Sequence, residues 1–320
     1  MKSILSILLC AVSMLAICNS ARSQGCVAIR STGGICAMDH SEPMDTVTKW
    51  ELNVNNRYFK SFRHFVGTEE QKQRVEQGTD VINHSYTLDI TPTYHLNKWW
   101  SFSLDVPILA NSRSSLYEHD GKTRHLTHSF GIGDVRLTAY RWLINPSKMP
   151  KGNIQVGLGI KFATGDYKYQ DFFYKNDSTS VLGPVDQSIQ LGDGGTGFTA
   201  EVNAFYSFSK HFSSYANLYY LANPREQNGT STARGGTPSA SSILYQSSTM
   251  SVPDQYMIRA GFNYIAKSLI ASLGVRDECL PVYDLIGGSG GFRRPGYIIS
   301  LEPGLTYSFK KISVYAFVPV

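Results

Sequence analysis

The composition of this 320-residue chain argues against a nucleic-acid-binding protein, because Lys and Arg total 30, Asp and Glu total 25, and the formal charge of +5 is scattered with no basic block. Charged residues make up 17% of the chain, below the roughly 25% usual in soluble globular domains. Tyr (19) and Phe (16) are abundant, which is typical of the walls of membrane β-barrels.

Residues 1–23 are interpreted as a cleaved export signal. Lys2 supplies the positive end, a continuous apolar run follows, and small residues lead to a cleavage site between Ser23 and Gln24. Lipoprotein processing at Cys18 is an alternative, although the residue before it is bulky where a small one is required. No later stretch holds 18 uncharged apolar residues, so no membrane-spanning helix is predicted.

Residues 24–46 form a mixed segment that we expect in the periplasm. Cys26 and Cys36 lie close together there, and export into an oxidising compartment favours a disulfide between them. A site for soft copper is an alternative, because thiolates and thioethers suit that ion and further candidate ligands stand nearby, namely Met38, His40 and Met44. The spacing matches no strong metal motif, so no metal or other cofactor is predicted. Cys279 remains, in or beside a predicted loop.

A β-barrel is predicted over residues 47–320, where apolar and polar residues alternate in eleven segments. A period of two indicates a strand with one apolar and one polar face. Pro92 lacks a ladder donor and is interpreted as a local bulge or gap. The segments lie at about 50–64, 85–96, 100–108, 133–143, 153–162, 198–208, 212–222, 255–264, 269–276 and 297–309, and from 312 onward.

Short and long connections alternate between these segments. Short ones lie near 97–98, 143–152, 209–211, 266–268 and 310–311, and long polar ones lie near 66–84, 110–128, 164–197, 223–253 and 277–295. Short turns on one side and long loops on the other are the pattern of bacterial outer-membrane barrels, in which the turns face the periplasm and the loops face outside. The fold predicted is therefore an all-β, antiparallel transmembrane β-barrel.

The strand count sets a constraint on this barrel. Single-chain barrels of this type have an even number of strands, and an unpaired edge in lipid is costly. We therefore expect a design of about twelve strands, whose last return strand is absent from this sequence, or else a count that is wrong by one. A soluble β-sandwich or lipid-binding barrel is the structural alternative, but it does not explain the long strands, the export signal and the alternating connections.

Charged residues at polar positions of the strands are predicted to face the lumen, because a charge on the lipid face costs a few kcal/mol at mid-depth. They either pair and fill a narrow barrel or line a polar path for a solute. The candidates are of mixed sign, so neither anions nor cations are favoured: Glu51, Arg57, Asp89, Asp105, Asp134, Arg136, Lys161, Glu201, Arg259 and Glu302.

An enzymatic barrel is the weakest of the alternatives. Outer-membrane lipid hydrolases use a His-x-Ser pair on a strand, because acyl transfer needs a base within reach of a serine. The match here is His211 and Ser213, which stand at a predicted periplasmic turn, away from the leaflet where such an enzyme is expected to act. No catalytic residues are therefore predicted.

Two segments resemble a known family. Residues 131–141 (GIGDVRLTAYR) and 157–167 (GLGIKFATGDY) are similar to a Gly-x-Gly-Asp strand and a strand ending near Pro-Thr-Gly-Asp in the outer-membrane family named for the meta-pathway of phenol degradation. Ala163 replaces the usual Pro, and residues 190–197 resemble the Gly-rich approach to that family's next strand. The resemblance, which covers mainly 130–208, implies an outer-membrane barrel and transport of small, aromatic or hydrophobic compounds.

The function expected is passive passage or uptake of small molecules by a monomeric barrel in the outer membrane of a Gram-negative bacterium, with membrane lipid as its surroundings and no nucleic-acid partner. A closed structural barrel, whose long loops meet other molecules, is the first alternative, and an outer-membrane lipid hydrolase is the second. The substrate and the state of the lumen are not determined by the sequence.

Overall fold

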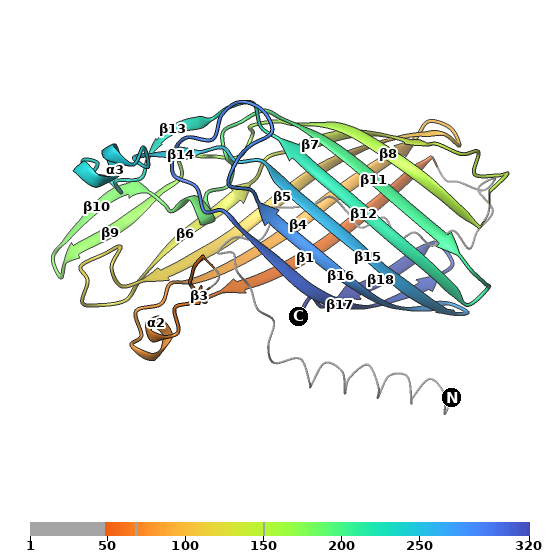
Figure 1. Cartoon of the computed structure of the whole chain (residues 1–320), viewed down its shortest axis with the longest axis horizontal. Helices are drawn as coiled ribbons and strands as arrows, with labels where there is room; N and C mark the ends of the chain where they lie inside the picture. The colour runs from red at the N-terminus through yellow and green to blue at the C-terminus, as the bar shows by residue number, and fades with distance from the viewer. Residues whose placement is uncertain (1–48, 68, 150) are drawn as a thin grey trace.

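The computed structural model describes residues 49–67, 69–149 and 151–320, which form a large antiparallel sheet curled around an interior (Figure 1). The sheet has 12 strands, of which β6 lies off the main path and the other eleven follow one another in chain order. The predicted all-β antiparallel fold is confirmed. The predicted export signal, N-terminal segment and Cys26–Cys36 pair fall within 1–48, outside the described residues.

The strands of the main path correspond closely to the alternating segments of the sequence. They are β1 (Trp50–Ser61), β4 (Ile82–His95), β5 (Trp100–Ser115), β7 (Arg136–Trp142), β8 (Gly152–Lys161), β11 (Gly197–Ser207), β12 (Phe212–Ala222), β15 (Gln255–Ala266), β16 (Leu269–Leu280), β17 (Gly296–Phe309) and β18 (Ile312–Phe317). Their connections are short at one end of the sheet and long at the other, and we call these the short-turn end and the long-loop end (Figure 1).

Small elements occupy the long connections. They are β2 (Phe65–Val66), β3 (Glu69–Glu70), α2 (Gln73–Glu76), β9 (Gln170–Asn176), β10 (Thr179–Pro184), η2 (Gln187–Ile189), β13 (Gln227–Ser231), α3 (Ala240–Leu244) and β14 (Thr249–Ser251). Within the described parts of the chain, no helix has the length and apolar character needed to cross a membrane.

One predicted loop is wrong at both ends. The segment 110–128 is predicted to be a connection, but β5 continues to Ser115, and β6 (His125–Ile132) pairs with the part of β5 nearer the long-loop end. β7 pairs with the inner half of β5, so β6 and β7 form one strand interrupted at 133–135. At Pro92 the pairing of β4 with β5 is interrupted without a change of register, which is the gap rather than the bulge.

The two faces of the sheet have opposite character. On β5, Ser103 and Asp105 are 7% and 4% exposed and point to the interior, whereas Leu104 between them is 40% exposed on the outside. This is the reverse of a soluble protein, in which apolar side chains fill the core. Arg141, at the short-turn end, stands on the outer face with its guanidinium 5.3 Å from the centre of the Trp100 ring.

Aromatic side chains mark two levels on the outer face. On β11, Phe198 and Tyr206 are exposed and eight residues apart, and on β17, Tyr297 and Tyr307 are exposed and ten residues apart. Since a strand rises about 3.4 Å per residue and barrel strands tilt by about 40°, the two levels lie roughly 20–25 Å apart. The outer side chains between them are mainly Ala, Leu, Ile and Val.

The two margins of the sheet are β1 and β18. Because the main path has eleven antiparallel strands, nine of them between the margins, both margins run from the short-turn end toward the long-loop end. Two side-chain contacts connect the margins to each other or to the neighbouring wall. The Tyr315 hydroxyl donates to Asn53 Oδ1 at 2.7 Å, and Arg57 pairs with Glu278 of β16 at 2.8 Å. Among the described residues, the two margins are thus linked by side-chain contacts, and no strand pairing joins β1 to β18.

Candidate functional site

The segment 185–195, which follows β10, folds inward and lies across the interior at the long-loop end; we call it the plug segment. Val185 and Ile189 are fully buried, and Leu191 is 4% exposed. The Ile189 carbonyl accepts hydrogen bonds from Ser129 Oγ at 2.5 Å and from Asn111 Nδ2 at 3.5 Å, so it is held by β6 and β5. The plug segment is therefore held against the inner side of the sheet at the long-loop end.

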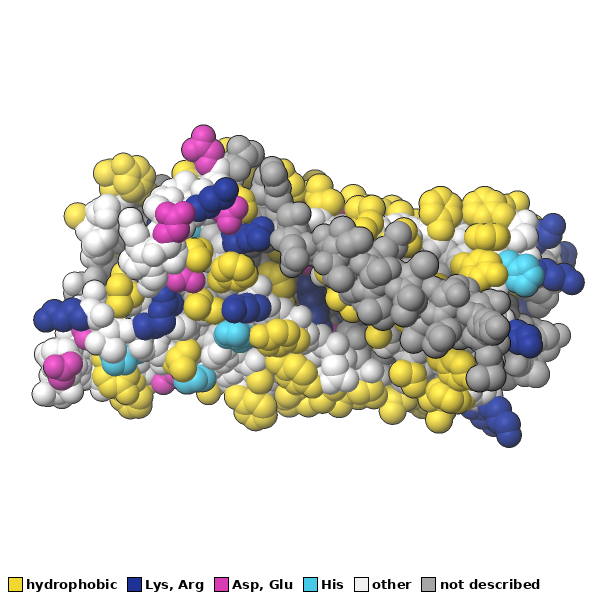
Figure 2. Space-filling model, turned by 90° about the horizontal axis from the view of Figure 1, so that it is seen from below, with side chains coloured by type: hydrophobic (Ala, Val, Ile, Leu, Met, Phe, Trp, Pro, Cys, Tyr) yellow, Lys and Arg dark blue, Asp and Glu magenta, His cyan; other side chains and the backbone are white. Residues whose placement is uncertain are grey.

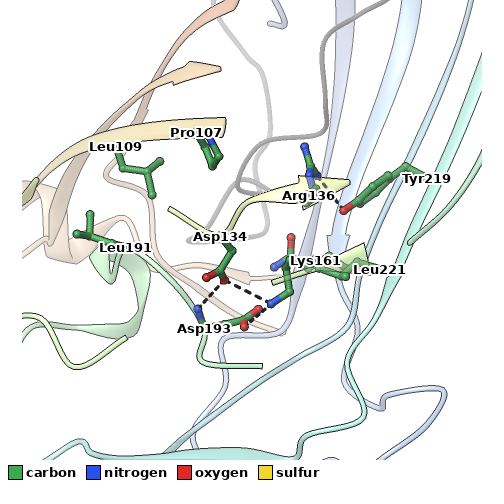
Figure 3. Close-up of a pocket in the computed structure, with 10 residues that line it drawn as sticks. Pro107, Leu109, Asp134, Arg136, Lys161, Leu191, Asp193, Tyr219 and Leu221 are labelled. Atoms are coloured by element: carbon green, nitrogen blue, oxygen red, sulfur yellow. Dashed lines mark hydrogen bonds and ion pairs between the residues drawn. The ribbon is translucent and has the colours of Figure 1, made fainter. Parts of the chain in front are cut away.

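Below the plug segment lies a small internal cavity (Figure 3). Its volume is about 30 Å³, and a water molecule needs roughly 10–15 Å³ by the same measure, so it holds one or two waters. Apolar and charged side chains share its wall, and they come from the plug segment and five strands: Pro107, Leu109, Asp134, Arg136, Lys161, Leu191, Asp193, Tyr219, Leu221 and Gln255. The cavity therefore has room for a few waters at most and for no larger solute.

Three charged groups connect the plug segment to the barrel wall (Figure 3). Lys161, at the end of β8, contacts Asp193 of the plug segment and lies 3.4 Å from Asp134 Oδ2. The Lys161 side chain is only 5% exposed, so the ammonium has lost most of its water. Asp134 also accepts from the Asp193 backbone N–H at 3.1 Å. One lysine thus lies between two carboxylates, one on the wall and one on the plug segment.

The three stretches that resemble the phenol-degradation family meet at this point. Asp134 Oδ1 accepts from the Gly165 N–H at 2.9 Å, and Thr164 Oγ1 donates to the Gly133 carbonyl at 2.8 Å. Gly165 in turn lies against the plug segment, where a Cβ on Gly165 would stand 2.7 Å from the Leu191 carbonyl oxygen. These short motifs are therefore explained by a tight backbone crossing that positions the plug segment.

A second charged group lies deeper in the interior, on strands β4, β5, β7, β11 and β12. Asp105 contacts Arg136 at 2.5 Å and accepts from Thr91 Oγ1 at 2.8 Å, and Arg136 donates to the Tyr219 hydroxyl at 2.9 Å. Glu201 accepts from the Tyr140 hydroxyl at 2.7 Å on the same side of the lumen. Buried charges are tolerated here because each has a partner of opposite sign or a hydroxyl donor.

A third group forms an alternating series on the opposite wall. Arg57 contacts Glu278, Glu278 contacts Arg276, Arg276 contacts Glu302, and Glu302 contacts Arg259, with distances between 2.6 and 3.2 Å. Glu302 has no exposed surface. The series joins β1, β16, β17 and β15, so it ties the margin of the sheet to the wall beside it.

A further buried network lies at the long-loop end and includes Asp186 of the plug segment. Asp186 contacts Arg294 at 2.6 Å and Arg113 at 3.5 Å, and Glu118 contacts Arg113 at 2.8 Å and Arg234 at 2.7 Å. Burial alone would raise the pKa of Asp186, but the guanidiniums of Arg113 and Arg294 hold it well below its usual value. Side chains from four long connections or strand ends thus converge on two carboxylates.

His119 joins the β9–β10 hairpin to this network. Its Nδ1 accepts from the Tyr174 N–H at 3.2 Å, and its ring stacks on the buried Phe173 and lies 5.1 Å from the ring of His125. Burial, followed by the nearby His125, lowers the pKa of His119. The neutral ring is the form that this packing favours.

The ten lumen candidates divide among these groups. Asp134 and Lys161 lie at the plug segment; Asp105, Arg136 and Glu201 form the second group; Arg57, Arg259 and Glu302 belong to the third. Asp89 is 1% exposed and acts electrostatically on Arg57. Glu51 lies apart, half exposed near the short turns, where its carboxylate is 3.2 Å from His95 Nε2.

Several members of these groups were not identified from the sequence, among them Asp193, Asp186, Arg113, Arg276 and Glu278. Arg276 is the last residue of the predicted 269–276 strand, Glu278 lies on the extension of β16 beyond it, and the others lie in or beside long loops. The apolar side chains within the otherwise polar segment 185–191 are the signal that would have indicated a buried loop, because solvated loops seldom need them.

The His-x-Ser pair does not form a catalytic contact. His211 Nδ1 interacts with the Ile265 carbonyl at 3.0 Å, and Ser213 Oγ accepts from Asn263 Nδ2 at 3.2 Å. Cys279 is a free, buried thiol beside Tyr256. Within the described part of the chain, no group of three or more His, Cys, Asp or Glu side chains is placed to hold a metal ion.

Comparison with known proteins gives fold-level similarity alone. No protein-family model matches the chain, and no curated protein sequence matches it. Among solved structures, a Pseudomonas aeruginosa FadL homologue is similar at 11% identity and a TM-score of 0.42, with 84% of this chain and 66% of that chain covered. The copper transporter OprC is similar at 10% identity and a TM-score of 0.27, with 75% and 38% covered. The chain thus spans less than two thirds of the length of each.

Proposed function

We propose that this protein is an outer-membrane β-barrel that admits small solutes through a lumen closed by the plug segment. The outer face supports the membrane location, because exposed apolar side chains such as Leu158 (70% exposed) and Phe262 (65% exposed) cover it between two levels of aromatic rings. Such a surface is unfavourable in water and matches the apolar band of outer-membrane barrels, which is about 25 Å tall.

The observation that carries the gating part of the proposal is the connection of the plug segment to the wall by a few polar contacts. The plug segment is continuous with a loop and is not part of the sheet, and Lys161 with Asp193 is its main charged link to β8. The wall, by contrast, is held by continuous strand ladders. Loss of the Lys161–Asp193 link is expected to loosen that end of the plug segment, while Arg113 and Arg294 still hold Asp186 at its other end and the sheet stays folded.

The solute suggested by this geometry is small and without a strong charge preference. The groups nearest the closed point are Lys161 and Arg136 against Asp134, Asp193 and Asp105, so neither sign dominates. The family resemblance and the aromatic Tyr219 at the cavity agree with small aromatic or hydrophobic compounds. A monomer is proposed, with lipid around its outer face.

Conductance in planar bilayers tests the proposal. The full chain is compared with a variant in which residues 186–192 are replaced by a Gly-Ser linker of equal length, and with the point variant Asp193→Asn. We expect brief or no openings for the parent, steady conductance for the linker variant and more frequent openings for Asp193→Asn. A matched control replaces 237–243, in the loop that contains α3, by the same linker and should behave as the parent.

A closed barrel that acts through its surface is the second candidate, and a specific observation favours it. The charged groups of the interior are paired and buried, as expected of a filled barrel. If the linker variant inserts and folds but never conducts, the closed barrel is the correct reading and the plug segment is simply part of the filling.

A further inference from the structure

The connections at the short-turn end share one chemical feature. Each of the five short turns contains at least one lysine, and none contains Asp or Glu: 96–99 is LNKW, 143–151 is LINPSKMPK, 208–211 is FSKH, 267–268 is KS and 310–311 is KK. All of these lysines are exposed, and none forms an ion pair among the residues the structure describes. Figure 2 shows basic side chains without acidic ones at this end and a mixture of both signs at the other.

A shallow groove opens on the outer face beside two of these turns. Its volume is about 360 Å³, within the range of ligand-sized pockets. The floor consists of small side chains on three adjacent strands, namely Gly152, Ala204, Ser214 and Ala216.

The walls of the groove are larger and apolar. Ile154 and Tyr206 stand beside the floor and are 40% and 49% exposed, and Ile144 and Met149 from the turn before β8 are 38% and 41% exposed. Gly152 is needed for this shape, because a Cβ there would stand 2.7 Å from Tyr206 Cδ2. The groove therefore presents an apolar trough on the side of the sheet that faces hydrocarbon in the proposed membrane location.

The charged end of the groove is set by the same elements. Lys148 and Lys151 lie on the turn that supplies Ile144 and Met149, and Lys210 lies on the turn between β11 and β12, whose strands supply the floor. The two turns are joined directly, since the Ser207 N–H donates to the Lys151 carbonyl at 2.6 Å. The apolar trough thus ends at two turns that carry three exposed lysines, none of which forms an ion pair among the described residues.

We infer that this groove binds one anionic phospholipid of the periplasmic leaflet, with an acyl chain along the floor and the phosphate among Lys148, Lys151 and Lys210. Basic clusters at the level of the headgroups attract anionic lipids, and each lysine there contributes to affinity. This inference rests on the proposed membrane location and orientation, and it does not depend on whether the lumen conducts.

Native mass spectrometry of the folded full chain in detergent tests the inference, with phosphatidylglycerol and phosphatidylcholine of identical acyl chains as the probes. We expect one phosphatidylglycerol retained per protein, and about tenfold weaker retention of phosphatidylcholine. The variant Lys148→Gln/Lys151→Gln/Lys210→Gln should lose about tenfold or more of the phosphatidylglycerol affinity. A groove variant, Ala204→Leu, should lose it without any change of charge.

The matched control is Lys98→Gln/Lys310→Gln/Lys311→Gln, which removes the same charge from turns away from the groove and should retain the lipid fully. Equal loss in the control variant, equal retention of the two lipids, or no effect of Ala204→Leu would each overturn the site and leave only diffuse attraction. Heat-modifiable migration in gel electrophoresis verifies that each variant is folded. If Ala204→Leu does not fold, Ala216→Leu serves as the second groove variant. Failure of the chain to insert into vesicles of any composition would instead contradict the proposed membrane location.

Discussion

The long-loop end and the short-turn end of this protein treat charge in opposite ways. At the long-loop end, Asp186 and Glu118 are buried and surrounded by arginines from separate segments. At the short-turn end, lysines such as Lys210 and Lys267 stand exposed on tight turns without an acidic neighbour in the same turn. The first end pairs its buried carboxylates within the chain, whereas the second carries exposed lysines that form no ion pair among the described residues.

The largest effect is expected from breaking the network of the long-loop end at its centre. Asp186→Ala leaves Arg113 and Arg294 without their shared carboxylate in a buried site, which typically costs about 3 kcal/mol or more. We expect the free energy of unfolding in urea to fall by about that amount and the loops to become sensitive to protease. Asp177→Ala, at an exposed hairpin tip, is the control and should show neither change.

The backbone crossing beneath the plug segment is the next point to break. Gly165→Ala places a Cβ within 2.8 Å of backbone atoms of Leu191 and Gly192, which cannot move as a flexible side chain would. We expect a loss of about 2 kcal/mol in the free energy of unfolding and more frequent channel openings. Gly236→Ala, whose nearest contact is 3.3 Å, provides the comparison. Unchanged openings in Gly165→Ala would show that the crossing does not hold the plug segment.

A smaller effect is expected from acid at the long-loop end. Because the folded-state pKa of His119 is lowered, the folded form disfavours its protonation, and the associated stability is complete above the ordinary value near 6.5 and is lost as the pH falls below it. We expect the protection factor of the Tyr174 amide, which corrects for the slower intrinsic exchange in acid, to be lower at pH 5 than at pH 7.5 in the parent. His119→Asn should remove that difference; its persistence would assign the pH response to another group.

The smallest effect is expected at the short-turn end. Exposed side chains without partners contribute little to folding, so replacing Lys98, Lys310 and Lys311 by Gln should leave the urea midpoint unchanged within error. A clear loss of stability would mean that these lysines have partners within the folded chain, and the contrast between the two ends would then be wrong.

The strands were predictable because each side chain of the sheet faces either the apolar outer surface or the polar interior, and the two environments require different residue types. The 212–222 segment, for example, has identical bounds in sequence and structure, although its alternation is less regular than that of its neighbours. The same rule places Asp105 and Glu302 in the interior. Alternation does not extend to segments whose surroundings are other loops, so the plug segment and the β9–β10 hairpin were not anticipated.

The composition of the candidate site was only partly accessible for the same reason. Asp134 and Lys161 are on or beside strands and follow from the pattern, whereas Asp193 reaches Lys161 through a fold of the chain that depends on Gly165 and Leu191. The pairing of Arg57 with Glu278 joins residues 221 positions apart. Such contacts are decided by the curvature of the whole sheet, which a local pattern does not contain.

Because β1 and β18 run in the same direction, the number of strands that could join them by antiparallel pairing is restricted. The outer edges of β1 and β18 can both form antiparallel hydrogen bonds only if an odd number of strands lies between them. The first of these strands would run from the long-loop end to the short-turn end. A hairpin inserted there would satisfy one border and leave the other in parallel register. An antiparallel closure of this wall therefore needs one strand or three. A single strand would replace the Tyr315–Asn53 side-chain contact with main-chain hydrogen bonds to both β1 and β18.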